Sequence, residues 1–285
     1  NDTINAGNGT NFVNGGNGNN TLTTGTGNDA IVGGTGNDTI SAGDGTNIVT
    51  TGAGNDTVTT GVGNDIIVMG PNLSSLDTVS GGAGTDILKV SGTLAGVAFA
   101  NVTGIEILDL TGAADVTLGA QGMTAGITSV TNSGGGGVTV DASAYTISIA
   151  ITGGAGADVL TGGAGVDTLN GGTGSDRFVF SDVDADTNAL PTGATDVVGS
   201  GFVSGADKLD FTIAGTVGNF QKVLPVSASL AAFIAAADTA LDGTVHYYFG
   251  VVGADGYLAM DTNGIGITAI IKMVGVVDMT FGDIV

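Results

Sequence analysis

Acidic side chains recur at a nine-residue interval through two stretches of this sequence, and they are its best candidates for metal ligands. Residues 6–68 divide without a gap into seven nine-residue blocks, with Gly at the second and fourth places and Asp or Asn at the sixth. Three similar blocks cover residues 153–179. Calcium prefers carboxylate and carbonyl oxygens. A carboxylate repeated in glycine-rich turns therefore indicates bound calcium ions.

The blocks also predict the elements that must position these acids. Gly permits backbone angles that a Cβ forbids, and Asp and Asn favour tight turns, so the first six residues predict a turn. The last three residues predict a short strand whose middle residue faces the core. Those middle residues are Val13, Leu22, Ile31, Ile40, Val49, Val58 and Ile67. Two blocks make one coil, and successive coils stack about 4.8 Å apart. The expected fold is all-β, a right-handed parallel β-roll or β-helix solenoid.

We expect calcium to bind between stacked turns, because the like charges of their carboxylates would otherwise repel one another. The expected carboxylate ligands are Asp2, Asp29, Asp38, Asp56, Asp65, Asp77, Asp86, Asp158, Asp167 and Asp176. The expected carbonyl ligands belong to Gly34, Gly36, Gly52, Gly54, Gly154, Gly156, Gly163 and Gly165. The alternative is that Gly, Asp and Asn only form turns. Turns alone, however, require no acid at a fixed place every nine residues.

Three blocks carry Asn instead of Asp at the sixth place, namely those of Asn11, Asn20 and Asn47. Asn keeps an oxygen ligand but loses the charge, so we expect weak or absent calcium binding beside these residues. The best site of the first array is expected between the turns of Asp38 and Asp56.

The ten blocks follow the pattern G-G-x-G-x-D-x-U-x, which resembles the nonapeptide of the RTX calcium-binding β-rolls. Residues 102–118, VTGIEILDLTGAADVTL, resemble rungs of bacterial surface-layer proteins. Residues 177–211 and 270–285 resemble the C-terminal region of serralysin-type secreted proteins. In that family an acid followed by hydrophobic residues is the address for type I secretion, and here Ile284 and Val285 follow Asp283. Because residues 1–5 read as the tail of a repeat, we expect further chain upstream.

Four segments are expected along the chain. Residues 1–89 form the first array, 90–152 calcium-free β-helix rungs, 153–179 the second array, and 180–285 a C-terminal cap with the secretion signal. Within the cap, residues 227–241 have apolar residues at helical spacing after a Ser and before Gly243, which predicts one helix. Strands are expected at residues 244–250, 257–261 and 267–274.

Composition excludes several classes of protein. With 27 acidic and 5 basic residues the formal net charge is −22, which is unsuited to a nucleic-acid backbone. There is no Cys, so disulfides and thiolate metal sites are excluded. His246 is the only His and no G-x-S-x-G motif accompanies it, so we expect no enzyme. The sequence lacks an apolar run of membrane-spanning length.

The outward strand residues differ between the two expected sheets. One carries a row of hydroxyls that includes Thr21, Thr39 and Thr57. This row suits a wet β-face, or else a flat face that binds glycan or ice. The other carries an apolar strip that includes Phe12 and Ile48, and contiguous exposed apolar residues usually mark a contact surface.

Together these features predict a calcium-dependent structural protein of the bacterial cell surface, similar to a surface-layer protein. The expected partners are further copies in a lattice or filament, the type I secretion machinery and a cell-surface polysaccharide. The expected location is extracellular. The alternatives are a C-terminal export and folding module of a secreted hydrolase such as a metalloprotease, or a surface adhesin or ice-binding module.

Overall fold

The computed structural model describes residues 1–180, 196–211, 218–223, 227–241, 245–261, 267 and 269–285. The chain forms two compact units, Asn1–Gly135 and Gly136–Val285, which we call the N-terminal and C-terminal units. The described chain is mostly strand and forms a parallel β-solenoid, and its described residues contain two α-helices. The predicted all-β solenoid is confirmed.

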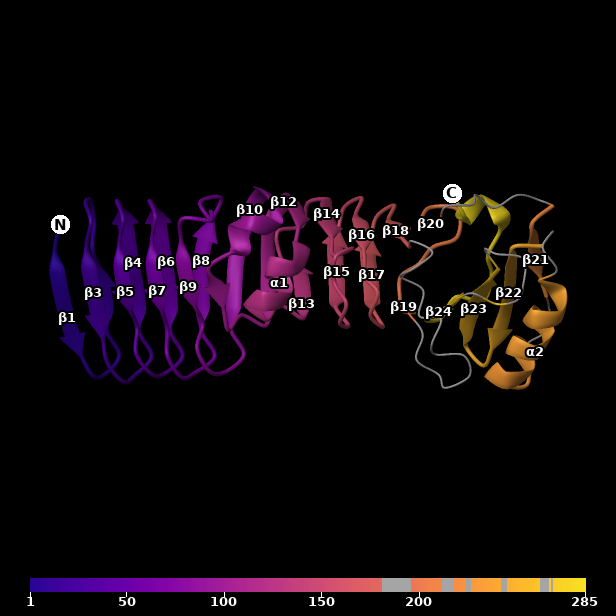
Figure 1. Ribbon diagram of the computed structural model, residues 1–285, viewed down its shortest axis with the longest axis horizontal. Helices are drawn as coiled ribbons and strands as arrows, with labels where there is room; N and C mark the ends of the chain where they lie inside the picture. The colour runs from indigo at the N-terminus through magenta and orange to yellow at the C-terminus, as the bar shows by residue number, and fades with distance from the viewer. Residues whose placement is uncertain (181–195, 212–217, 224–226, 242–244, 262–266, 268) are drawn as a thin grey trace. The chain divides into compact units, whose positions relative to one another are not determined.

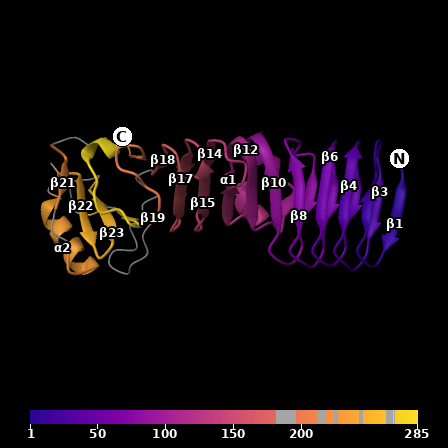
Figure 2. The same ribbon diagram turned by 180° about the vertical axis from the view of Figure 1, so that it is seen from behind.

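Two parallel sheets build the N-terminal unit (Figure 1). The first contains, in order, β1 (Thr3–Gly7), β3 (Thr21–Thr24), β5 (Thr39–Ser41), β7 (Thr57–Thr59), β9 (Thr78–Ser80) and β11 (Val102–Thr103). The second contains β2 (Phe12–Asn14), β4 (Ala30–Thr35), β6 (Ile48–Ala53), β8 (Ile66–Gly70), β10 (Ile87–Leu94), β12 (Ile107–Thr117) and β13 (Ser129–Asn132). Figure 2 shows β4, β6 and β8 side by side. Successive strands of a sheet come from successive coils, as the period predicts.

The register of these sheets follows the two-block coil. Leu22 pairs with Ile40 and Ile40 with Val58, so equivalent residues lie 18 apart. After the interruption at residues 71–76 the separation becomes 21, with Val58 opposite Val79. The middle one of the last three residues of each block, from Val13 to Ile67, is buried. The predicted core row is therefore confirmed. Residues 96–126 add a 3₁₀ turn, η1 (Gly96–Phe99), and α1 (Gly119–Ala125). Helix α1 was not predicted, because its sequence GAQGMTA has no clear apolar period.

The C-terminal unit begins with the same arrangement. In one row β14 (Val138–Asp141), β16 (Val159–Thr161), β18 (Arg177–Val179) and β20 (Lys208–Asp210) pair in parallel. In the other, β15 (Ala150–Ala155), β17 (Thr168–Thr173), β19 (Asp196–Val198) and β24 (Ala269–Met273) do so. Thr244, at which one predicted strand begins, lies outside the described residues.

A mixed sheet completes this unit. It contains β21 (Phe220–Lys222), β22 (Tyr247–Val252) and β23 (Asp255–Met260), and β23 pairs antiparallel with both β22 and β24. Helix α2 (Leu230–Ala240) packs on it through Phe233, whose ring lies 5.6 Å from that of Tyr248. The Ser229 hydroxyl caps the helix by accepting from the Ala232 N–H at 3.2 Å. Because β24 covers the edge of β19, this sheet protects an edge that would otherwise be open to aggregation. The helix predicted within residues 227–241 is confirmed as α2.

Candidate metal centres

The sixth-place side chains form continuous ladders along the edges of the coils. In each step, one side-chain oxygen accepts the backbone N–H of the equivalent residue one coil earlier. Thus the Asn20 N–H donates to Asp38 Oδ1, and the Asp38 N–H to Asp56 Oδ1, both at 2.8 Å. The ladders of the N-terminal unit run through Asp2, Asn20, Asp38, Asp56 and Asp77, and through Asn11, Asp29, Asn47, Asp65 and Asp86. The two edges are those that the spacing predicts.

The ladders also include three acids that the sequence analysis did not identify. Glu106 Oε2 accepts the Asp86 N–H at 2.8 Å, so the only Glu of the chain takes the place of an Asp. In the C-terminal unit Asp196 accepts the Asp167 N–H at 2.8 Å, and Asp207 accepts the Asp176 N–H at 2.9 Å. These acids lie 20, 29 and 31 residues after their partners rather than 18. The longer separations hide them from a search for the nine-residue period.

We call a turn open when Oδ2, the second carboxylate oxygen of its sixth-place Asp, is buried without a hydrogen-bond partner. Among the described residues, six turns have a buried Oδ2 without a hydrogen-bond partner, namely those of Asp29, Asp38, Asp56, Asp65, Asp86 and Asp158. A buried carboxylate oxygen without a partner is strongly unfavourable. Each open turn therefore requires either a proton or a cation.

In the open turns of Asp38, Asp86 and Asp158, glycine at the first place of the block leaves room for that oxygen. A Cβ added to Gly33 would lie 2.7 Å from Asp38 Oδ2 and 2.4 Å from the Thr51 carbonyl oxygen. At Gly81 the same test gives 2.7 Å to Asp86 Oδ2 and 2.0 Å to the Gly104 carbonyl oxygen. In the C-terminal unit, Asp158 Oδ2 lies 2.2 Å from the corresponding Cβ position of Gly153. The space that glycine leaves open thus receives a carboxylate oxygen, and in the first two turns a carbonyl oxygen as well.

The Asn turns show which other atoms face the sixth side chain. Asn11 Nδ2 donates to the carbonyls of Gly7 and Gly9, both at 3.0 Å. Asn47 Nδ2 donates to the carbonyls of Gly43 and Gly45, at 3.1 and 3.3 Å. The carbonyls at the second and fourth places therefore point toward the sixth side chain, where the amide supplies the positive end of a dipole. An Asp carboxylate at this place has no donor to offer them.

The Asp38 turn shares the backbone of these Asn turns. Gly34 and Gly36 have φ of 114° and 113°, in the left-handed region that also holds Gly43 and Gly45. By analogy with the Asn turns, the Gly34 and Gly36 carbonyls would join Asp38 Oδ2 and the Thr51 carbonyl as hard oxygen donors of the kind that calcium binds. The residues of this turn thus fit the predicted ion, and Gly34 and Gly36 remain its predicted carbonyl donors.

Basic side chains do not neutralise the open turns. All five pair with an Asp outside the ladders, in the pairs Lys89–Asp109, Arg177–Asp210, Lys208–Asp283, Lys222–Asp278 and Lys272–Asp255. Burial raises the pKa of Asp56, Asp158 and Asp176. Burial, with the charges of Asp65 and Glu106, raises the pKa of Asp86 to about 6. The direction of these pKa shifts agrees with the absence of a basic side chain beside these carboxylates.

In other turns that hold a predicted ligand, a donor from the protein satisfies the Oδ2 atom of the Asp, and we call these turns closed. Asp77 Oδ2 accepts the N–H and the hydroxyl of Ser74, at 2.8 and 3.0 Å. Asp167 Oδ2 accepts the Gly163 N–H at 2.6 Å, and neither Gly163 nor Gly165 has the positive φ of its counterparts in open turns. Asp2 lies exposed at the first coil. Among the described residues no three Asp, Glu or His side chains converge on one point. Each candidate site accordingly combines one carboxylate with backbone carbonyls.

Comparison with known protein families matches residues 1–22, 23–58, 32–67, 76–89 and 150–178 to the RTX calcium-binding nonapeptide repeat. The chain carries RTX repeats. This confirms the resemblance of the nine-residue blocks and supports calcium as the ion. The matched ranges omit residues 90–149 and 179–285, where the likenesses to surface-layer and serralysin-type proteins were noted. No curated protein matches the chain.

Exchanging Asp and Asn at the sixth place should change the number of bound ions and leave the fold intact. We expect Asp38→Asn to bind one calcium ion fewer, because its amide would donate to the Gly34 and Gly36 carbonyls. Asn47→Asp should bind one more. Isothermal titration calorimetry gives the stoichiometry. The control is Asp44→Asn, an exposed acid of the same array, which should bind as the wild type does. Unchanged stoichiometry in both test variants would contradict this assignment.

Protons should partly replace calcium in the metal-free chain as the pH falls from about 6 toward 4. The folded-state pKa of Asp86 lies near 6 and above its ordinary value of 3.8, so folding favours the protonated form. That stabilisation is complete below the ordinary pKa of 3.8 and is lost as the pH rises through the folded-state pKa. The β-structure signal of metal-stripped protein in circular dichroism should therefore increase over this pH range. Asp86→Asn should show a smaller increase, and a signal independent of pH in the wild type would refute the expectation.

Proposed function

We propose that this protein is a calcium-dependent structural protein of the bacterial cell surface, exported by type I secretion and folded by extracellular calcium. The observation that carries the proposal is the set of buried carboxylate oxygens in the open turns, which no basic side chain neutralises. RTX repeats, which the chain carries, bind calcium and are typical of secreted proteins. The proposal includes no catalytic activity.

The open turns couple folding to location. Where calcium is scarce, stacking the coils would bury uncompensated negative charges, so the chain remains unfolded and suited to export. Outside the cell, calcium fills sites built from Asp carboxylates and Gly carbonyls. Because the unfolded chain has no preformed site, the free energy of binding becomes free energy of folding.

A row of apolar residues and a row of hydroxyls on the N-terminal unit favour a structural role. On the second sheet Phe12, Ala30, Ile48, Ile66, Ile87 and Ile107 stand directly opposite one another from strand to strand. Phe12 is 72 % exposed and Ile48 48 %. A contiguous apolar row of this kind usually marks a contact surface. We propose that it forms lateral contacts between copies in a lattice or filament, which supports a surface-layer-like role. No helix among the described residues is long and apolar enough to cross a membrane.

The other face offers a surface for a polysaccharide of the cell envelope. The outward residues of β3, β5 and β7 are Thr or Ser, and Thr21, Thr39 and Thr57 are exposed in register. Hydroxyls donate and accept hydrogen bonds, as sugars require. The same row is the feature that supports the alternative of an adhesin or ice-binding module.

Calcium should fold and then assemble the metal-free chain. We expect circular dichroism to show β-structure appearing as calcium is added, and electron microscopy to show sheets or filaments at higher protein concentration. Ile48→Lys should abolish assembly without affecting folding, because it places charges in the apolar row. Thr39→Lys, on the hydroxyl face, is the matched control and should still assemble.

Two results would contradict the proposal. A β-structure spectrum that is unchanged by chelation would refute calcium-dependent folding. A calcium-loaded protein that remains monomeric at all concentrations would refute the structural role and favour the export module of a secreted enzyme.

A further inference from the structure

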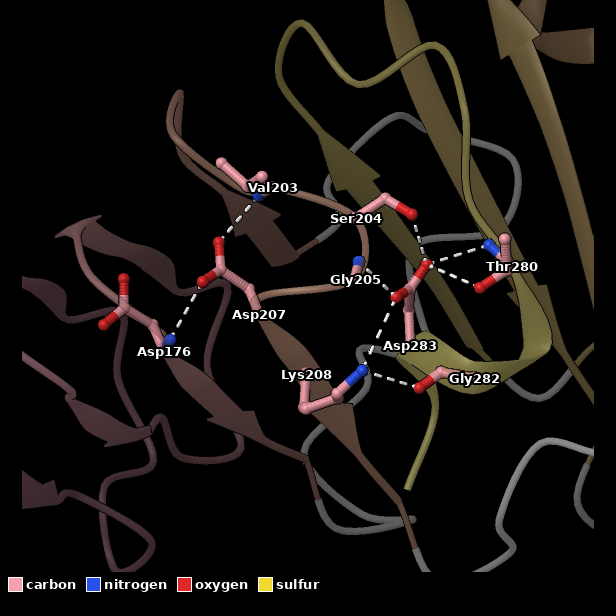
Figure 3. Close-up of polar contacts among 9 residues, drawn as sticks. All are labelled: Asp176, Val203, Ser204, Gly205, Asp207, Lys208, Thr280, Gly282 and Asp283. Atoms are coloured by element: carbon pink, nitrogen blue, oxygen red, sulfur yellow. Dashed lines mark hydrogen bonds and ion pairs between the residues drawn. The ribbon is translucent and has the colours of Figure 1, made fainter.

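Residues 280–285 are anchored within the C-terminal unit by the carboxylate of Asp283 (Figure 3). Asp283 is fully buried and accepts from the Ser204 hydroxyl and the Gly205 N–H, both at 2.7 Å. It also accepts the Thr280 N–H at 2.8 Å and the Thr280 hydroxyl at 3.1 Å. Lys208 Nζ lies 3.7 Å from Asp283 Oδ1 and donates to the Gly282 carbonyl at 2.7 Å.

The residues after Asp283 continue this docking along β20. The Val285 N–H donates to the Leu209 carbonyl at 2.9 Å, and the Phe211 N–H to the Val285 carbonyl at 3.0 Å. Ile284 bridges to Leu209 in parallel and is 2 % exposed. The segment thus adds a short strand to the end of the solenoid row β14–β16–β18–β20.

The loop that holds Asp283 is also the last step of a ladder. Asp207 Oδ1 accepts the Asp176 N–H at 2.9 Å, and Asp207 Oδ2 accepts the Val203 N–H at 2.7 Å. The Lys208 N–H donates to the Asp176 carbonyl at 2.7 Å. Residues 203–208 therefore contact the Asp176 turn of the second array on one side and Asp283 on the other, as Figure 3 shows.

This arrangement makes the docking of 280–285 depend on the order of the second array. Ser204 and Gly205 present their donors together only while residues 203–207 are closed around the Asp207 carboxylate. The conformation of residues 203–207 in turn depends on the Asp176 turn, because Asp207 Oδ1 accepts the Asp176 N–H. The Asp176 turn is linked to the open turn of Asp158, whose N–H donates to Asp176 Oδ1 at 3.1 Å.

We propose that residues 280–285 form a calcium-controlled strap, which docks on β20 when the Asp158–Asp176–Asp207 ladder is ordered by calcium and is released when calcium is removed. The proposal rests on the calcium-dependent folding proposed above. Phe281 and Val285 are 43 % and 40 % exposed in the docked strap, so its release mainly uncovers the buried side chains of Asp283 and Ile284.

The full chain offers a clean test because it contains no Cys. In Ile284→Cys, the thiol should react at least about tenfold more slowly with a maleimide in calcium than in chelator, since reaction requires the strap to open. Val62→Cys, at a site 60 % exposed in the wild type, should react rapidly in both conditions. Circular dichroism on the same samples reports whether calcium folds the chain.

A second substitution tests the link itself. Adding Asp207→Ala to Ile284→Cys should restore rapid reaction in calcium, although Asp283 and its donors remain in the chain. Asp238→Ala, an exposed acid on α2, is the matched control and should leave the thiol protected. Hydrogen exchange of the Phe211 and Val285 amides gives the same comparison without a Cys, should Ile284→Cys fail to fold.

Equal thiol reactivity with and without calcium, in a chain that calcium does fold, would overturn the strap and leave the proposed function standing. Protection that survives Asp207→Ala would overturn the coupling. If calcium produces neither β-structure nor protection, the proposed function fails together with the strap.

Discussion

The structure depends on burying negative charge that the protein does not neutralise. Each Asp of a ladder uses one oxygen to satisfy a backbone N–H in the neighbouring coil, which secures the stacking. In the open turns the other oxygen is buried without a hydrogen-bond partner, and at Asp38 and Asp86 it shares its space with a backbone carbonyl. An uncompensated charge in such a place costs several kcal/mol. Stacking at these turns therefore requires a proton or a cation.

In other turns, hydrogen bonds from the protein satisfy the buried oxygens that would otherwise require an ion. Asn47 turns its own amide toward the carbonyls that a cation would otherwise meet. Ser74 closes the carboxylate of Asp77, and the Gly163 N–H closes that of Asp167. Open and closed turns differ by one or two hydrogen bonds and have nearly the same sequence. Turns whose carboxylate lacks a partner are thus distributed unevenly along a regular fold.

Much of the negative charge of this chain lies in buried turns rather than on the exposed faces of the strands. The net charge of −22 comes largely from Asp side chains, and many of these are buried in the turns. Strands β3, β5 and β7 present hydroxyl residues outward, and β2, β4, β6 and β8 present the apolar row, so parts of a strongly acidic chain carry uncharged surface. Filling the open turns would remove much of the charge that opposes association. Folding and assembly would then respond to the same ion.

The sequence by itself determined the solenoid, its core row and the two edges of acids. These follow from a nine-residue period that acts locally, since each block forms its own turn and strand. The tertiary structure alone decided which carboxylates remain open, because that depends on donors brought from elsewhere, such as Ser74 beside Asp77. It also revealed Glu106, Asp196 and Asp207 as ladder members, since insertions had obscured their spacing. The anchoring of Asp283 by residues 204–208 lay beyond any period, because the contact joins residues nearly 80 apart in the chain.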